Sequence, residues 1–263
     1  MFFKKKKFAV NPAEQLQEDR KYLLTRKQNF YLEEAYKSLR TNVSFAMAGK
    51  EDSKIIMVTA AAQGEGKSIT SANLAISFAQ AGKKTLLIDC DLRRPKQARL
   101  FLLKSVAGLS NVLLQPDQLD SALLDTTNAN LKLLLSGDVP PNPSELLGSE
   151  GMKKLLEKLR DRFDYIILDT PPVNLVTDAM VLAAFIDGVL FVVRSGRAEI
   201  NQVKKAVGQM EYAGAKLLGF VLNDMKDHSN RSGYKSKYSY KYGYKYGYGY
   251  GYGYGYGEKK KRS

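Results

Sequence analysis

Apolar runs alternate with amphipathic stretches through the middle of the chain. Six runs of five or six residues are rich in Ile, Leu and Val and predict buried strands at 54–59, 84–89, 131–135, 165–169, 188–193 and 217–222. Between and around them the pattern predicts helices at 31–45, 71–80, 144–147, 151–161 and 198–213, with helix and loop expected over 105–128. This alternation predicts an α/β fold with a mostly parallel sheet and helices on both faces.

The first predicted strand leads into a glycine-rich loop. Residues 64–68 read Gly-Glu-Gly-Lys-Ser and match the end of the P-loop pattern, although Ala61 stands where that pattern begins with Gly. Glycines allow backbone N–H groups to curl around phosphate oxygens, and the following helix N-terminus adds partial positive charge. The loop therefore predicts a P-loop NTPase site, in which Lys67 contacts the β and γ phosphates of ATP and Ser68 ligates Mg²⁺.

Acidic residues follow two further strands. Asp89 and Asp91 end the second predicted strand, and residues two apart in an extended segment point the same way. Asp169 ends the strand at 165–169, which is the Walker B arrangement, where an apolar strand delivers one carboxylate to a metal. The carboxyl ends of parallel strands are where ligands bind, so we expect Lys67 and the three carboxylates to form one catalytic site.

Charge is concentrated at the two ends of the chain. Residues 1–50 carry 11 Lys or Arg against 5 Asp or Glu, and residues 226–263 carry 10 against 2, whereas residues 51–225 are balanced at 20 against 20. We expect a basic, irregular segment at 1–30 and a globular domain at 31–228. The first residues, two Phe followed by four Lys, are either a solvated terminus or a contact for an anionic membrane surface.

The segment 229–263 has the composition of a disordered tail. It has no Leu, Ile, Val or Phe, so it cannot bury a core. It contains 11 tyrosines between Gly, Lys and Ser residues: Tyr234, Tyr238, Tyr240, Tyr242, Tyr244, Tyr246, Tyr248, Tyr250, Tyr252, Tyr254 and Tyr256. These hydroxyls are the candidate phosphoacceptors, and a flexible chain of this length spans roughly 30 Å, enough to reach a neighbouring subunit.

Other classes of site have little support. Cys90 is the only cysteine, so a disulfide within the chain is excluded, and the lack of a His/Cys cluster argues against zinc. No run of 18 apolar residues predicts a membrane-spanning helix.

Together, the three motifs and the tail resemble the bacterial tyrosine kinases of the BY-kinase family, CpsD/CapB type. The resemblance covers about residues 30–225 and rests on residues 64–68, on Ile88-Asp-Cys-Asp-Leu-Arg93 as the Walker A′ motif and on Ile167-Leu-Asp-Thr-Pro-Pro172 as Walker B. It implies an ATP- and Mg²⁺-dependent protein-tyrosine autokinase that phosphorylates its own tail, between chains, and regulates capsular or exopolysaccharide synthesis.

The resemblance also implies a role for each site residue. Asp89 would be the base that activates the tyrosine hydroxyl, and Ser68, Asp91 and Asp169 would organise Mg²⁺ and its waters. Nucleotide binding is expected at Gln63, Gly64, Glu65, Gly66, Lys67, Ser68, Ile69 and Asn223. Glu34, Lys37 and Arg40 are similar to the family's E-x-x-R-x-x-R oligomerisation motif, with Lys in place of the middle Arg, which cannot make the same bidentate contact.

Partners follow from the same resemblance. A soluble kinase of the Gram-positive version implies a separate membrane-bound activator of polysaccharide assembly, a cognate tyrosine phosphatase and a reversible ring-shaped homo-oligomer. The kinase is then expected in the cytoplasm, held at the inner face of the membrane through its partner, with no nucleic acid bound.

Two alternatives remain open from sequence. A positioning ATPase of the ParA/MinD type shares the P-loop and acidic strand ends, but that group carries an extra early lysine that residues 59–63 lack. Alternatively, the protein is not an enzyme and the tail is an adhesive segment, because nucleic-acid bases or cations can stack on its tyrosine rings.

Overall fold

The computed structural model describes residues 20–24, 30–49, 54–104 and 107–225. The chain divides into residues 1–226 and 227–263, and the described residues all belong to the first part. The predicted acceptor tyrosines, the predicted tail and most of the basic N-terminal segment therefore lie outside the described residues.

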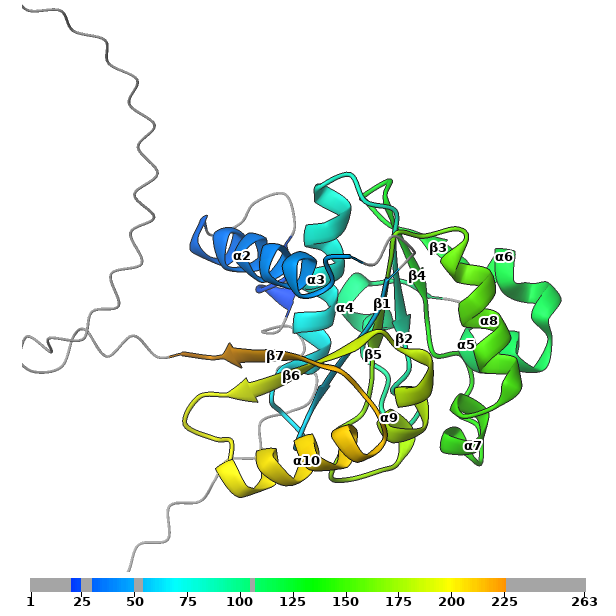
Figure 1. Ribbon diagram of the computed structural model, residues 1–263. Coiled ribbons are helices and arrows are strands. Elements are labelled where there is room, and N and C mark those ends of the chain that lie inside the picture. Colours follow the sequence, from blue (N-terminus) through cyan, green and yellow to red (C-terminus); the bar gives the residue numbers. More distant parts are fainter. Residues whose placement is uncertain (1–19, 25–29, 50–53, 105–106, 226–263) are drawn as a thin grey trace, which may run out of the picture. The chain divides into compact units, whose positions relative to one another are not determined.

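A seven-stranded sheet forms the centre of the domain (Figure 1). Its strands lie in the order β3-β4-β2-β5-β1-β6-β7, and every neighbouring pair is parallel except β3 with β4. The bounds are β1 Lys54–Ala60, β2 Thr85–Asp89, β3 Leu123–Asp125, β4 Leu131–Leu134, β5 Tyr165–Asp169, β6 Gly188–Arg194 and β7 Leu217–Asn223. The predicted α/β fold with a mostly parallel sheet is confirmed.

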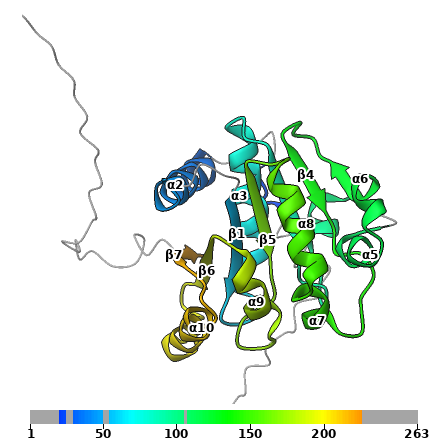
Figure 2. The ribbon, with the colours of Figure 1, turned by 45° about the vertical axis from the view of Figure 1, so that its right-hand side comes forward.

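Helices cover both faces of the sheet, as predicted (Figure 2). One face carries α2 Phe30–Ala46, α3 Lys67–Gln80 and α4 Gln97–Phe101. The other carries α5 Leu109–Leu114, α6 Leu119–Ala122, α7 Pro143–Leu147, α8 Glu150–Arg160, α9 Asp178–Val181 and α10 Ile200–Tyr212, with short 3₁₀ turns at Pro116–Gln118 and Leu182–Phe185.

Alternation along the central strand explains the continuous apolar runs. In β1, Ile55 and Met57 belong to the core beneath α8 and α10, whereas Ile56 and Val58 belong to the core beneath α2 and α3. All four side chains are fully buried. A parallel strand covered on both faces has no solvent side, so its sequence shows no polar alternation.

Two predictions about elements were inaccurate. Helix α3 begins at Lys67, four residues before the expected start at Ser71, because the polar phosphate motif itself forms the first turn. The region 105–128 holds helices, but also the three-residue strand β3, which is too short to leave a periodic signal. Within the described residues, no helix is long and apolar enough to cross a bilayer.

Candidate active site

The loop between β1 and α3 has the conformation of a phosphate cradle. Gly66 precedes the first helical residue with a φ of 98°, in the left-handed region that favours glycine. No side chain among the described residues caps the N-terminus of α3, so its first backbone N–H groups are available to an anion. Lys67 and Ser68 are buried in this first turn, whereas Gln63 and Gly64 are exposed.

Asn223 at the end of β7 closes the loop from the side. Its Nδ2 donates a hydrogen bond to the Glu65 carbonyl at 2.9 Å. A Cβ atom on Gly66 would lie 2.0 Å from this Nδ2, too close for any real contact. The structure thus brings Asn223 to the phosphate loop, where Gly66 is required for its conformation and any added side chain would displace the Asn223 amide.

We expect Gly66→Ala to abolish ATP binding and to lower the free energy of unfolding by about 1–3 kcal/mol, because the methyl group strains the backbone and displaces Asn223. Gly64→Ala is the matched control, since Gly64 has a φ of 80° but nothing within 4 Å of the added Cβ. Urea unfolding and calorimetric ATP titration measure both effects. Equal losses in the two variants would contradict the steric argument.

Three carboxylates and one ammonium meet at the carboxyl ends of β2 and β5. Asp89 and Asp169 are paired in the register of these adjacent strands. Lys67 Nζ donates to Asp91 Oδ2 at 3.0 Å. Lys67, Asp89, Asp91 and Asp169 are each less than 9% exposed. The catalytic set predicted from sequence is therefore brought together in one buried cluster.

The electrostatics of this cluster show uncompensated negative charge. Burial and the charge of Asp169 raise the pKa of Asp89 to about 8, although backbone hydrogen bonding from Gln97 opposes the shift. Burial also raises the pKa of Asp169, against the charge of Lys67 and the hydrogen bond from Gln97. For Lys67, burial lowers the pKa, but the charges of Asp169 and Asp91 outweigh it and the pKa is raised.

The donor set fits a divalent cation bound together with phosphate. Three carboxylates against one ammonium leave a formal charge of −2, and Asp169 Oδ1 is buried without a hydrogen-bond partner among the described residues. A buried carboxylate oxygen without a partner is costly unless a ligand satisfies it. Among the described residues no group of three His, Cys, Asp or Glu is placed to hold a metal ion by itself, and Mg²⁺ usually combines one or two carboxylates with phosphates and waters.

Several residues of this site carried no usable signal in the sequence. Gln97 at the start of α4 is fully buried and donates to Asp169 Oδ2 at 2.8 Å. Arg93, noted in its motif without a role, makes a bidentate pair with the buried Asp178 of α9 at 2.9 and 3.1 Å. Their partners lie 72 and 85 residues away in the chain, so no local pattern could have revealed either contact.

Arg194 at the end of β6 joins the phosphate loop to the end of β7. Its backbone N–H donates to the Glu65 carboxylate, and its guanidinium donates to the Gly64 carbonyl at 3.1 Å and to Asp224 Oδ2 at 2.8 Å. Asp224 has a φ of 54° and is the first residue after β7. Hydrogen bonds from Arg194 and Asn223 thus occupy the carbonyl groups of Gly64 and Glu65 in the loop.

The predicted oligomerisation residues divide into two kinds. Glu34 and Lys37 are on the accessible part of α2, where Lys37 pairs with Glu33 and Glu34 at 2.8 and 2.9 Å. Arg40 instead donates to the Ser77 carbonyl and hydroxyl of α3 at 2.7 and 3.1 Å. Arg40 thus holds α2 on α3 within the chain, whereas Glu34 and Lys37 are accessible to a neighbour.

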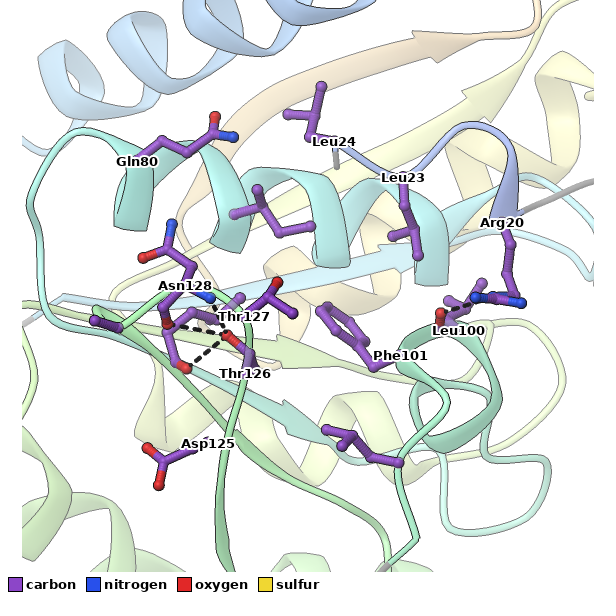
Figure 3. A pocket seen from close by; sticks show the side chains of 14 residues that line it. Arg20, Leu23, Leu24, Gln80, Leu100, Phe101, Asp125, Thr126, Thr127 and Asn128 are labelled. Carbon is purple, nitrogen blue, oxygen red and sulfur yellow. Dashed lines mark hydrogen bonds between the residues drawn. The ribbon is translucent and has the colours of Figure 1, made fainter. Parts of the chain in front are cut away.

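A cavity of about 750 Å³ lies apart from this cluster, between residues 20–24, α3, α4 and residues 125–131 (Figure 3). Leucine side chains and Phe101 line it together with Thr126, Thr127 and Asn128. None of the predicted phosphate-site residues, all of which the structure describes, is part of its lining.

Comparison with protein families supports the motifs. The family model described as an AAA domain matches residues 53–210. Tyrosine-protein kinase YwqD of Bacillus subtilis is 42% identical over 206 residues, which are 78% of this chain and 86% of YwqD. The putative tyrosine-protein kinase CapB of Staphylococcus aureus is 39% identical over 77% of this chain and 89% of its own length.

Solved structures give the same result. The chimerical protein CapA2B2 matches with a TM-score of 0.69 and 41% identity, over 73% of this chain and 84% of its own. The kinase domain of Escherichia coli tyrosine kinase ETK matches with a TM-score of 0.71 and 36% identity, over 80% of each chain.

The positioning ATPases are more distant. The septum site-determining protein MinD of Pyrococcus horikoshii reaches a TM-score of 0.55 at 24% identity, over 65% of this chain and 70% of its own, which shows a common fold only. The chain has a nucleotide-binding P-loop fold, and its much closer relatives are kinases. By its motifs, its site and these relatives, the chain belongs to the family of bacterial tyrosine-protein kinases.

Proposed function

We propose that this kinase uses ATP and Mg²⁺ to phosphorylate the tyrosines of its own C-terminal tail, in trans, and thereby regulates capsular or exopolysaccharide synthesis. The observation that carries the proposal is the buried cluster of Lys67, Asp89, Asp91 and Asp169 beside the uncapped N-terminus of α3. Phosphoryl transfer requires positioning and charge neutralisation more than covalent chemistry, and this cluster can supply both.

Each side chain has a distinct role in this proposal. Lys67 and the N–H groups of the loop would bind the β and γ phosphates, while Gln63, Gly64, Glu65, Gly66 and Ile69 shape the cradle and Asn223 closes it. Ser68, Asp91 and Asp169 would hold Mg²⁺ and its waters, in keeping with the unpaired Asp169 Oδ1. ATP supplies the phosphoryl group, and Mg²⁺ neutralises charge on its oxygens.

Asp89 would take the proton of the incoming tyrosine hydroxyl in its ionised form, which the charge of Mg²⁺ bound with nucleotide would favour, since the pKa of Asp89 is raised to about 8 without it. Tyrosine has a pKa near 10 and is a poor nucleophile at neutral pH, so a positioned base is needed. Asp89 Oδ2 already accepts backbone N–H groups of Lys96 and Gln97 at 3.0 Å, and Oδ1 accepts that of Asp91 at 3.3 Å. These bonds fix the carboxylate while leaving further lone pairs for the substrate.

The acceptor is the tyrosine-rich tail at 229–263. It follows β7, whose last residue Asn223 contacts the phosphate loop, so the chain leaves the described domain beside the site. A flexible segment of this length spans roughly 30 Å, which allows transfer between neighbouring chains.

We expect transfer in trans when a Lys67→Ala chain with an intact tail is mixed with a chain that is active but lacks residues 229–263. ATP and Mg²⁺ should then produce phosphotyrosine, seen on a blot, only on the Lys67→Ala chain. Each chain incubated alone is the control and should remain unlabelled. If the mixture stays unlabelled while the intact wild-type chain labels itself, transfer occurs within one chain. If the wild-type chain also fails, the proposed activity is wrong.

The proposed partners follow from the relatives. A membrane-bound activator would hold the kinase at the inner face of the membrane, and a tyrosine phosphatase would reverse the reaction. Accessible Glu34 and Lys37 on α2 would contact the next subunit of a homo-oligomer.

A further inference from the structure

Gln97 occupies a central position in the site without being part of any motif. Its side chain is fully buried, and its Nε2 lies 2.8 Å from Asp169 Oδ2, 3.0 Å from the Ser68 carbonyl and 3.2 Å from Ser71 Oγ. An amide NH₂ group has two hydrogens for these three acceptors, and the contact with the carboxylate is the shortest. The side chain thus joins the first turn of α3 to the end of β5.

The backbone of the same residue contacts the third segment of the site. The Gln97 N–H donates to Asp89 Oδ2 at 3.0 Å, next to the N–H of Lys96. Helix α4, which begins at Gln97, is also fixed further along, where Arg20 Nε donates to the Leu100 carbonyl at 3.2 Å (Figure 3). Gln97 therefore lies on an anchored helix and contacts three segments of the site: the end of β2, the first turn of α3 and the end of β5.

The two carboxylate oxygens of Asp169 therefore have different surroundings. Oδ2 accepts the Gln97 amide, whereas Oδ1 is buried and has no partner in the part of the chain that the structure describes. Without the amide, the carboxylate could rotate about its last bond and present either oxygen. With it, one oxygen is occupied and the other stays available.

We propose that Gln97 is a positioning residue for the divalent cation, fixing the Asp169 carboxylate so that its unpaired oxygen can serve as the cation's ligand. This inference rests on the proposed function, since it assumes that Mg²⁺ binds with nucleotide at this cluster. Replacing a group that orients a metal ligand typically weakens metal binding about 10- to 100-fold. A residue needed only for packing would not affect metal affinity selectively.

The test compares ADP binding with and without Mg²⁺ by isothermal titration calorimetry. In Gln97→Leu, the Mg²⁺ concentration that half-restores tight ADP binding should rise about 10- to 100-fold, while ADP affinity in EDTA changes by less than about threefold. Gln97→Glu keeps the side-chain length but faces Asp169 with a second carboxylate, so we expect at least as large a rise. Gln209→Leu is the control, because the Oε1 of Gln209 on α10 is buried without a partner among the described residues, as is the Oε1 of Gln97, but Gln209 lies outside the cluster, and this variant should match wild type.

The outcomes separate this inference from the proposed function. If ADP binding by the wild-type chain does not depend on Mg²⁺, both the inference about Gln97 and the proposed function are overturned. If Mg²⁺ restores tight ADP binding in the wild-type chain, either of two results for Gln97→Leu would overturn the inference alone. One is half-restoration of ADP binding at the same Mg²⁺ concentration as wild type, and the other is an equal loss of ADP affinity in EDTA. If circular dichroism shows that neither Gln97 variant folds, the side-chain amide NMR signal of Gln97 in the wild-type ADP complex decides. A shift that follows the Mg²⁺ titration supports the inference, and an unchanged signal overturns it.

Discussion

Replacing Lys67 by methionine is expected to reduce phosphotyrosine formation by at least about 10³-fold, because it removes the buried ammonium that pairs with Asp91 and is expected to contact the phosphates. It should also lower the free energy of unfolding by about 3 kcal/mol, since Asp91 loses its partner at 3.0 Å in a buried site. Incorporation of labelled phosphate from ATP measures the first effect, and urea unfolding the second.

Lys83→Met is the matched control. Lys83 lies just after α3, is exposed, and has no contact with the cluster, so both quantities should stay close to wild type. A Lys67→Met chain that keeps more than a tenth of the wild-type rate would show that another group neutralises the phosphates. Unchanged stability would show that the Asp91 pair contributes little in the absence of nucleotide.

Replacing Asp89 by asparagine should separate catalysis from stability. We expect kcat to fall about 10²- to 10⁴-fold, the usual contribution of a positioned base, while ADP binding changes little. The substitution keeps the shape of a carboxyl whose pKa is raised to about 8 by burial and the charge of Asp169, and asparagine adds no negative charge to the buried cluster at any pH. We therefore expect the melting temperature of the nucleotide-free protein to be equal to or above that of wild type.

Asp164→Asn provides the comparison for this variant. Asp164 Oδ2 also accepts a backbone N–H, that of Lys84 at 2.8 Å, but Asp164 directly precedes β5. It therefore lies at the amino-terminal end of this strand, whereas the cluster lies at the carboxyl end. Its rate should equal that of wild type. A kcat of Asp89→Asn within tenfold of wild type would remove Asp89 from the role of base, whatever the effect on stability.

The fold could be predicted from sequence wherever burial decides the pattern. The central strands β1, β2 and β5 are covered on both faces, so they read as continuous apolar runs, and β2 and β5 end at Asp89 and Asp169, which mark their limits. The edge strand β3 was missed because three residues paired with one neighbour have almost no pattern of their own. The start of α3 was placed late because the phosphate motif is polar although it is helical.

The site could be predicted in part for the same reason. Lys67, Asp89, Asp91 and Asp169 stand at the ends of recognisable strands or loops, and strand order alone brings such ends together. Gln97, Asp178 and Arg194 could not be found, because their importance lies in contacts with residues 72, 85 and 129 positions away. A single polar residue in an unremarkable segment gives no indication of a distant carboxylate.

The shared guanidinium of Arg194 has a mechanical consequence. One rigid planar group donates both to the Gly64 carbonyl and to Asp224, so neither acceptor can move without pulling on the same group. A movement of the Gly64 carbonyl therefore disturbs the same side chain that pairs with Asp224, the first residue after β7.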